Sequence, residues 1–308
     1  MNNLMAKVAV LNGGYSAERD ISLASGKAIY SALIKKGVNA VAIDVDDNIA
    51  MLLSEGNFTS AFVIMHGRGG EDGTIQGLLE WLQIPYTGSG VLASSLAMDK
   101  FKTKLIWQSL NLATPKSILL HHKSDFKQVL NNLGGKVMVK PNREGSSLGL
   151  TCAYDAQTLA DAFMTAHKLD DTVFAEQWIA GDEYTVGIIN GKALPIIKIE
   201  TKADFYDFDA KYNSTNTKYI IPSGLDNEAT TKMQNLAMKA YEAIGCSGWG
   251  RVDFLMGSNN EPLLIEINTI PGMTSHSLVP KAAKALGIEF DDLVMDILNG
   301  AKTYRSEP

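Results

Sequence analysis

The residues best suited to chemistry lie on a predicted hairpin near the C-terminus, where polar and apolar side chains alternate. The polar set consists of Arg251, Asp253, Glu266 and Asn268. A two-residue turn at Asn259 and Asn260 would join the strands, because asparagine tolerates the positive φ of such turns. That turn pairs Asp253 with Glu266 and Arg251 with Asn268, so that all four side chains share one face.

The opposite face of this hairpin is uniformly apolar, which predicts that it is the core side. Its residues are Val252, Phe254, Met256, Leu263, Ile265 and Ile267. Paired Cβ atoms lie about 4.5 to 5.5 Å apart, so Asp253, Glu266 and Asn268 could share a cation. An all-oxygen set suits magnesium, or manganese, together with substrate phosphates. Arg251 would add a fixed positive charge for a phosphoryl group. A surface hairpin with cross-strand charge pairs is the alternative.

Two lysines are candidates for binding phosphate. Lys140 ends an apolar strand and precedes a loop rich in small residues, 141–149, whose backbone amides could approach a polyphosphate. The loop has neither the P-loop order nor GxGxxG, and an ordinary strand-to-loop connection is the alternative. Lys100 lies near the start of a helical segment, where the dipole disfavours a cation unless an anion is near; a solvated surface lysine is the alternative.

Two further loops, 12–18 and 66–73, each follow an apolar strand and precede a helix. In open parallel sheets this is the carboxyl edge, where ligands bind. Glu18 could hold a substrate ammonium, or it could simply favour the first turn of its helix. His66 could transfer a proton or donate a hydrogen bond, or it could be a structural histidine.

The elements that must position these residues follow from apolar periodicity. We expect strands at 8–11, 40–43, 61–65, 136–141, 184–189 and 193–199, and helices at 18–36, 74–82, 97–110 and 228–244. The segment from Phe174 alternates polar and apolar residues into a turn, as an exposed strand would. The early alternation of strands and helices predicts βαβ units on a parallel sheet. Turn-rich segments divide the chain into predicted domains 1–90, 91–181 and 182–308.

Composition narrows the class of protein. The chain has 308 residues, a net charge of −6 and two cysteines. The acidity disfavours binding to nucleic acid or to an anionic membrane. The cysteines lack metal-site or disulfide spacing, which favours a reducing compartment, and the apolar run 8–11 is too short for a signal peptide or a membrane span. We therefore expect a cytoplasmic protein.

Six dispersed motifs together resemble the D-alanine–D-alanine ligases of the ATP-grasp family over nearly the whole chain. The motifs lie at 11–18, 66–73, 139–149, 210–212, 248–253 and 266–277. The resemblance implies an α/β fold, with an N-terminal parallel-sheet α/β domain and two α+β domains that form an ATP-grasp cleft. It implies transfer of the ATP γ-phosphoryl group to one D-alanine and attack by the amine of a second, for peptidoglycan precursor synthesis.

The resemblance also implies roles for individual residues. The nucleotide-binding positions are Lys100, Lys140, Ser146, Ser147, Glu176, Gln177, Trp178, Ile179, Glu183 and Lys211. The magnesium ligands are Asp253, Glu266 and Asn268, which agrees with the hairpin argument. The catalytic residues are Glu18, Ser146, Arg251, Lys211 and Tyr212, and the substrate-binding residues are Glu18, His66, Gly272, Ser277 and Leu278.

Three alternatives stay open. One is another ATP-grasp carboxylate–amine ligase, and another is a ligase that forms D-alanyl-D-lactate, although Tyr212 resembles the dipeptide-forming members. The third is a nucleotide-binding regulatory module without turnover, which the joint presence of lysines, arginine and metal ligands disfavours. The expected partners are ATP, D-alanine and a second copy of the chain in a homodimer.

Overall fold

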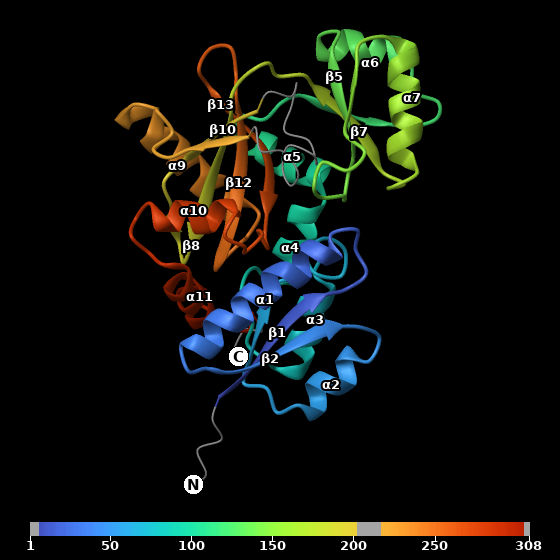
Figure 1. The fold of residues 1–308 in the computed structure, drawn as a ribbon. Coiled ribbons are helices and arrows are strands. Elements are labelled where there is room, and N and C mark those ends of the chain that lie inside the picture. The colour runs from blue at the N-terminus through green and yellow to red at the C-terminus, as the bar shows by residue number, and fades with distance from the viewer. Residues whose placement is uncertain (1–5, 202–216, 305–308) are drawn as a thin grey trace.

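The described part of the chain folds into three sheets with helices packed on them (Figure 1). The computed structural model describes residues 6–201 and 217–304. The strands are β1 (Lys7–Gly13), β2 (Asn39–Val45), β3 (Ser60–Val63), β4 (Ser117–Leu120), β5 (Val137–Pro141), β6 (Thr151–Ala153), β7 (Val173–Gln177), β8 (Glu183–Ile189), β9 (Lys192–Ala193), β10 (Ile197–Glu200), β11 (Lys218–Ile220), β12 (Trp249–Met256) and β13 (Pro262–Asn268). The helices are α1 (Arg19–Lys35), α2 (Ile49–Glu55), α3 (Thr74–Leu82), α4 (Val91–Met98), α5 (Lys100–Ser109), α6 (Phe126–Leu133), α7 (Ala156–His167), α9 (Asn227–Ala243), α10 (Leu278–Lys284) and α11 (Phe290–Asn299).

The first sheet is parallel and has the order β2-β1-β3. Its central strand β1 is buried along almost its whole length, as a strand covered on both faces must be. The parallel sheet and the helices predicted at 18–36 and 74–82 are confirmed, with α3 beginning and ending at the predicted residues. Glu18 occupies the N-cap position of α1, just before the first helical turn in which it was expected.

The second sheet is antiparallel, with the order β4-β7-β5-β6, and α6 and α7 share its core. The expectation of an exposed strand from Phe174 is wrong. β7 lies between β4 and β5, and Phe174, Ala175 and Glu176 are all buried. The polar position that suggested exposure is a carboxylate with buried cationic partners, described below.

The third sheet has the order β11-β10-β8-β12-β13, with β9 paired to β8. The β12–β13 hairpin keeps both predicted pairs, but the predicted two-residue turn is wrong. Gly257 N donates to Glu261 O at 2.8 Å and Asn260 has a φ of +56°, the arrangement of a three-residue loop that ends in a left-handed residue. This loop shifts the pairing by one residue, and a β-bulge beside Asp253 restores it.

The bulge also changes which side chains reach the core. Leu264 is fully buried opposite Phe254, whereas Leu263 and Ile265 are only partly buried. The prediction that Leu263 and Ile265 lie on the core side is therefore wrong, because strict alternation does not allow for the extra residue of a bulge. Ile265 instead lines the cavity that contains the candidate site.

Two predicted elements are interrupted. The helix expected at 97–110 is two helices, α4 and α5, because Asp99 leaves the helical conformation and caps α5 by accepting from Lys102 N at 3.0 Å. The strand expected at 193–199 is split into β9 and β10.

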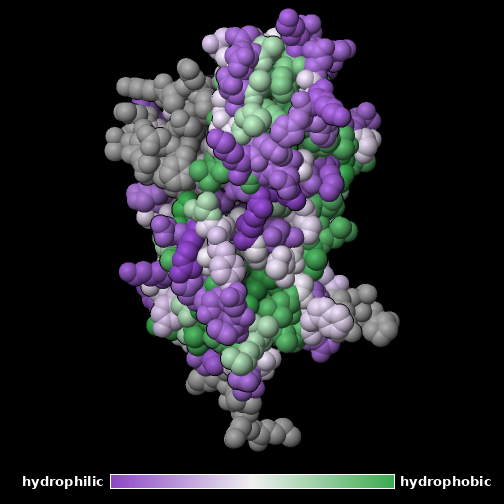
Figure 2. Space-filling view, turned by 90° about the vertical axis from the view of Figure 1, so that its right-hand side faces the viewer, coloured by the Kyte–Doolittle hydropathy of each residue, from purple (hydrophilic) through white to green (hydrophobic). Residues whose placement is uncertain are grey.

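The apolar side chains of residues 6–201 and 217–304 form three cores. One joins the first sheet to α10 and α11, so both ends of the described chain pack together. The second packs α4, α5 and α9 on the third sheet, and the third lies under α6 and α7. The domain boundaries near residues 90 and 181 stay a prediction. Among the described residues, no helix combines the length and apolar character needed to cross a membrane. On the face in Figure 2, hydrophilic residues are interspersed with smaller apolar areas.

Candidate active site

A cavity of about 530 Å³ lies between the second and third sheets, with polar and apolar parts to its wall. All the predicted nucleotide-binding residues that the structure describes line it. These are Lys100, Lys140, Ser146, Ser147, Glu176, Gln177, Trp178, Ile179 and Glu183. Apolar side chains, among them Met138, Leu150, Ile199, Leu255 and Ile265, supply surface against which a flat ring could pack.

One end of the cavity is built on a buried carboxylate. Glu176 on β7 forms an ion pair with Lys140 on the neighbouring strand β5, and a second with Lys104 on α5 at 2.9 Å. Burial alone would raise the pKa of Glu176, but the two ammonium groups outweigh it and hold that pKa below its usual range. Glu176 is therefore ionised inside the protein.

Lys100 connects the glycine-containing loop to the hairpin. Its Nζ donates to Glu144 O at 2.7 Å and lies 3.6 Å from Glu266 Oε2. The side chain is only 12% exposed, so the alternative of a solvated surface lysine does not hold. The N-terminus of α5 tolerates this cation because carboxylate and carbonyl oxygens surround it.

The polar face of the hairpin carries the side chains proposed to bind the metal and the phosphoryl group. Arg251 donates from Nε and Nη2 to the two carboxylate oxygens of Asp253, at 2.8 and 2.7 Å. Asn268 Nδ2 donates to Asp253 Oδ2 at 3.0 Å, and Thr185 Oγ1 donates to Oδ1 at 2.5 Å. Asp253 is thus held rigidly, and it faces Glu266 in the strand register.

These donors fit a magnesium ion. No cluster of three or more His, Cys, Asp or Glu side chains in the described ranges is placed to hold a metal. The expected set has two carboxylates, Asp253 and Glu266, and the amide oxygen of Asn268, and it stays a prediction. Magnesium commonly uses one or two carboxylates and completes its shell with phosphates and water.

The glycine-containing loop reaches the first sheet at Glu18. Ser146 Oγ donates to Glu18 Oε1, and both residues are buried. Ser146 and Ser147 have φ values of +51° and +60°, so this turn is unusual for residues with a Cβ. Strain of this kind concentrates at ligand-binding turns.

His66 lies close to Glu18. It is 5% exposed, and its Nε2 has no hydrogen-bond partner within the described part of the chain. Burial lowers the pKa of His66, with the Glu18 carboxylate opposing that shift, so the ring is neutral at pH 7. Glu71 lies in the same region, and its pKa is raised to about 8, chiefly by burial and then by Glu18.

The remaining predicted substrate residues follow β13. Ser277 occupies the N-cap position of α10, and its Oγ accepts from Thr274 N at 2.9 Å. A Cβ built on Gly272 would lie 3.0 Å from that Oγ, so the absence of a side chain at Gly272 lets Ser277 approach the backbone closely. Leu278 begins α10 and is buried. Lys211 and Tyr212 lie outside the described residues.

Comparison with known proteins decides the family. A model described as "D-ala D-ala ligase C-terminus" matches residues 106–299, and "D-ala D-ala ligase N-terminus" matches residues 50–89. A D-alanine–D-alanine ligase from Nitrosococcus oceani is 50% identical over 292 residues, covering 95% of this chain and 92% of that protein.

The chain belongs to the D-alanine–D-alanine ligase family. The D-alanine–D-alanine ligase from Bacillus anthracis, solved in complex with ATP, is 33% identical with a TM-score of 0.84, covering 96% of this chain and 97% of that one. The VanG D-Ala:D-Ser ligase from Enterococcus faecalis is 28% identical with a TM-score of 0.82, covering 96% and 98%. The expected ATP-grasp fold of this family is confirmed.

Two ionisable residues near the site of this family member, the buried Lys104 and the partly buried Glu71, were not singled out from the sequence. Lys104 gives a signal in retrospect, since it lies one helical turn from Lys100 and shares a face with the buried Trp107. Glu71 gives no such signal. Its Oε2 accepts from Gly67 N at 2.8 Å and its Oε1 from Ile270 N at 3.3 Å, contacts that only the folded chain creates.

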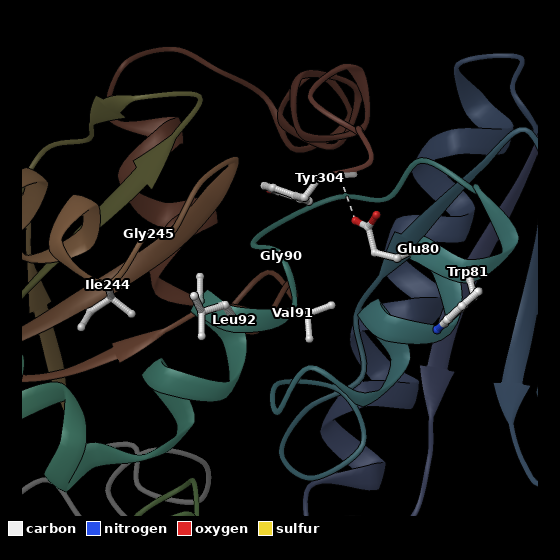
Figure 3. Close-up of a pocket in the computed structure, with 9 residues that line it drawn as sticks. Glu80, Trp81, Gly90, Val91, Leu92, Ile244, Gly245 and Tyr304 are labelled. Atoms are coloured by element: carbon white, nitrogen blue, oxygen red, sulfur yellow. Dashed lines mark hydrogen bonds between the residues drawn. The ribbon is translucent and has the colours of Figure 1, made fainter. Parts of the chain in front are cut away.

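A second cavity of about 530 Å³ has a mostly apolar wall and lies away from these residues (Figure 3). Among the described residues that line it, Glu80 carries the charge, and its carboxylate accepts from Tyr304 N at 2.7 Å and from Tyr86 Oη at 2.8 Å. Trp81 and Leu92 are exposed at its rim. Nothing in this wall suits a polyphosphate, so size alone does not identify the site.

Proposed function

We infer that this chain joins two D-alanine molecules to D-alanyl-D-alanine at the expense of ATP, releasing ADP and phosphate, as a step in peptidoglycan precursor synthesis. One observation carries the inference. The cavity lined by Lys100, Lys140 and Glu176 opens onto the polar hairpin face at Glu266. A nucleotide bound there would direct its phosphates toward Arg251 and the carboxylates of the hairpin.

The phosphates would bind to Lys100 and Lys140 and to backbone amides of the loop 144–149. Asp253, Glu266 and Asn268 would hold magnesium, or manganese, which when bound neutralises developing charge on the phosphoryl group. Such chemistry needs positioning and charge more than a protein nucleophile. The covalent intermediate would be D-alanyl phosphate, formed on the substrate itself.

The first D-alanine would place its ammonium on Glu18 and its carboxylate near Arg251 and the Gly272 amide. Glu18 is fixed for this role by its bond to Ser146. We propose that Tyr212 joins this hydrogen-bonded set and that Lys211 reaches the phosphates.

The second D-alanine would bind with its carboxylate at Ser277 and Leu278, so that its amine faces the acylphosphate. His66 would complete the pocket. Its neutral ring can accept a hydrogen bond without adding a cation beside the ammonium of the first D-alanine and the amine of the second.

The decisive assay incubates the purified protein with ATP, magnesium and D-alanine and measures ADP, phosphate and dipeptide by mass spectrometry. We expect all three in equal amounts, and phosphate release without dipeptide at millimolar D-alanine would overturn the assignment. A panel with D-serine, D-lactate and other D-amino acids as acceptors tests a ligase of different specificity.

A matched pair of hairpin variants tests the metal site. Glu266→Gln should abolish turnover with the fold retained. Glu261→Gln, at an exposed carboxylate whose ion pair with Lys232 spans 3.8 Å, should behave like the wild type. Full activity of Glu266→Gln would exclude the metal role.

We also propose that the protein is a cytoplasmic homodimer. A cytoplasmic location matches the use of ATP and two free cysteines. Light scattering after size-exclusion chromatography tests the dimer, and a monomer at micromolar concentration would refute it.

A further inference from the structure

Lys104 is a fully buried lysine that none of the roles above uses. Its side chain is 1% exposed, in the middle of α5. Burying an ammonium group raises the free energy of the folded state strongly unless the group is paired and hydrogen-bonded. Lys104 Nζ meets both conditions, donating to Thr114 Oγ1 at 2.8 Å and lying 2.9 Å from Glu176 Oε2.

The two oxygens of Glu176 are divided between two lysines. Lys140 pairs with Oε1 and Lys104 with Oε2, and the three side chains are 9%, 1% and 4% exposed for Lys140, Lys104 and Glu176. Two cations share one anion, so the group carries a surplus positive charge inside the protein. Burial lowers the pKa of Lys104, and Glu176 is the main influence opposing that shift.

The two lysines differ in what they face. Lys140 and Glu176 line the nucleotide cavity, whereas Lys104 does not belong to its wall. Lys104 thus approaches Glu176 from the protein side and is not available to a ligand. A bound phosphate can attract Lys140, but it cannot replace Lys104.

Lys104 is also fixed to the opposite wall of the cavity. Thr114, which accepts its hydrogen bond, donates to Leu264 O on β13 at 2.7 Å, and Leu264 N donates to Ala113 O at 2.9 Å. The chain of contacts runs from β7 through Lys104 to the strand that carries Glu266. It therefore joins the sheet of Glu176 to the sheet of the proposed metal ligands.

We propose that Lys104 is a positioning residue that serves as the permanent counter-ion of Glu176 and so releases Lys140 to the incoming nucleotide. This rests on the proposed nucleotide site. Without Lys104, Lys140 would be the main partner of a buried carboxylate, and moving toward a phosphate would leave that carboxylate uncompensated. With Lys104 in place, Lys140 can exchange partners while Glu176 stays ionised and paired with a cation.

The test is a double-mutant cycle on nucleotide binding, measured by calorimetry with MgATP and with MgADP. Lys104→Met should weaken binding at least about 10-fold, since an uncompensated buried carboxylate then opposes it. Glu176→Gln removes that carboxylate, so adding Lys104→Met to Glu176→Gln should change binding less than 3-fold. In the ligase assay, Lys104→Met should raise the KM for ATP and leave the KM for D-alanine unchanged.

The controls separate this role from packing. Lys102 lies on the same helix, and its side chain is 66% exposed. The Lys102→Met variant should therefore bind nucleotide like the wild type. Lys104→Arg should restore part of the affinity. If Lys104→Met does not fold, the same cycle is run with Lys104→Gln, which keeps a polar side chain beside Thr114 and Glu176 but carries no charge.

Two results would overturn the proposal. One is unchanged MgATP binding in Lys104→Met, and the other is an equal loss in the presence and absence of Glu176. Failure of the proposed function is distinguishable, because calorimetry needs no turnover. A wild type that binds MgATP without forming dipeptide would refute the ligase assignment and leave the cycle readable.

Discussion

Replacing Gly145 by alanine should displace the carboxylate that we propose holds the first substrate. A Cβ at this position would lie 2.3 Å from Glu18 Oε2 and 2.8 Å from Glu18 Cδ, whereas ordinary contact begins at 3.4 Å. The carboxylate must therefore move by about 1 Å. It is buried and bonded to Ser146, so this movement also disturbs the loop over the cavity.

A misplacement of 1 Å in a positioning group costs up to about 100-fold in rate, which corresponds to about 2.7 kcal/mol. We therefore expect the kcat/KM for D-alanine to fall by about 10- to 100-fold. Gly145 lacks the positive φ that would strain alanine, so the midpoint of thermal unfolding should stay within a few degrees of the wild type. MgATP affinity should fall less than the kcat/KM for D-alanine, because the closest contacts of the added methyl group are with Glu18, although Gly145 also lines the cavity.

Steady-state kinetics with D-alanine varied at saturating ATP, together with calorimetry for MgATP, measures both effects. Gly77→Ala is the matched control, since a Cβ there meets nothing within 4 Å and alanine favours the helix. An unchanged kcat/KM in Gly145→Ala, with the fold intact, would mean that Glu18 does not hold the substrate ammonium. An equal loss in both glycine variants would implicate general stability instead.

Two further changes test the electrostatics. Asp253→Asn should lower the free energy of unfolding by about 3 kcal/mol, because Arg251 loses its carboxylate partner, which calorimetry measures. The same variant should need a higher magnesium concentration for ADP release, which a magnesium titration measures. An unchanged magnesium requirement would contradict a ligand role for Asp253. Glu71, with a folded pKa of about 8 against a usual value of 4.5, binds more protons in the folded state than in the unfolded state. The contribution of Glu71 to the free energy of unfolding should therefore be most favourable below pH 4.5 and should decrease as the pH rises toward 8. Urea unfolding at pH 5 and pH 8 should show a smaller decrease for Glu71→Gln than for the wild type. Equal decreases in the two proteins would refute the burial argument.

The local fold could be predicted wherever periodicity and end signals agree. The segment Thr74–Leu82 is helical as predicted, with Gly73 in a left-handed conformation before it and Gln83 after it. In the hairpin, periodicity alone predicts only part of the structure. Alternation placed Asp253 opposite Glu266, but loop length and the bulge depend on hydrogen bonds around Asn260 that alternation does not encode.

The buried charged residues of the candidate site were harder to predict from the sequence than the helices and strands. A glutamate between Ala175 and Gln177 has the pattern of an exposed strand, and only the arrival of Lys104 and Lys140 from other elements makes its burial tolerable. The energetic reason for the position of Glu176 lies in residues 72 and 36 positions away, so no local window contains it. The family resemblance supplied Glu176 as a nucleotide contact but gave no reason for Lys104.

The proposed phosphate site is built from cations that already have anionic partners. Lys140 pairs with Glu176, Arg251 with Asp253, and Lys100 lies near Glu266. Binding a polyphosphate with its metal would then exchange one set of charges for another instead of placing new charge in a buried cleft. The exchange is favourable only if each carboxylate keeps a partner afterwards. For Asp253 and Glu266 the metal can provide that partner, whereas Glu176 is not a proposed metal ligand and must rely on Lys104.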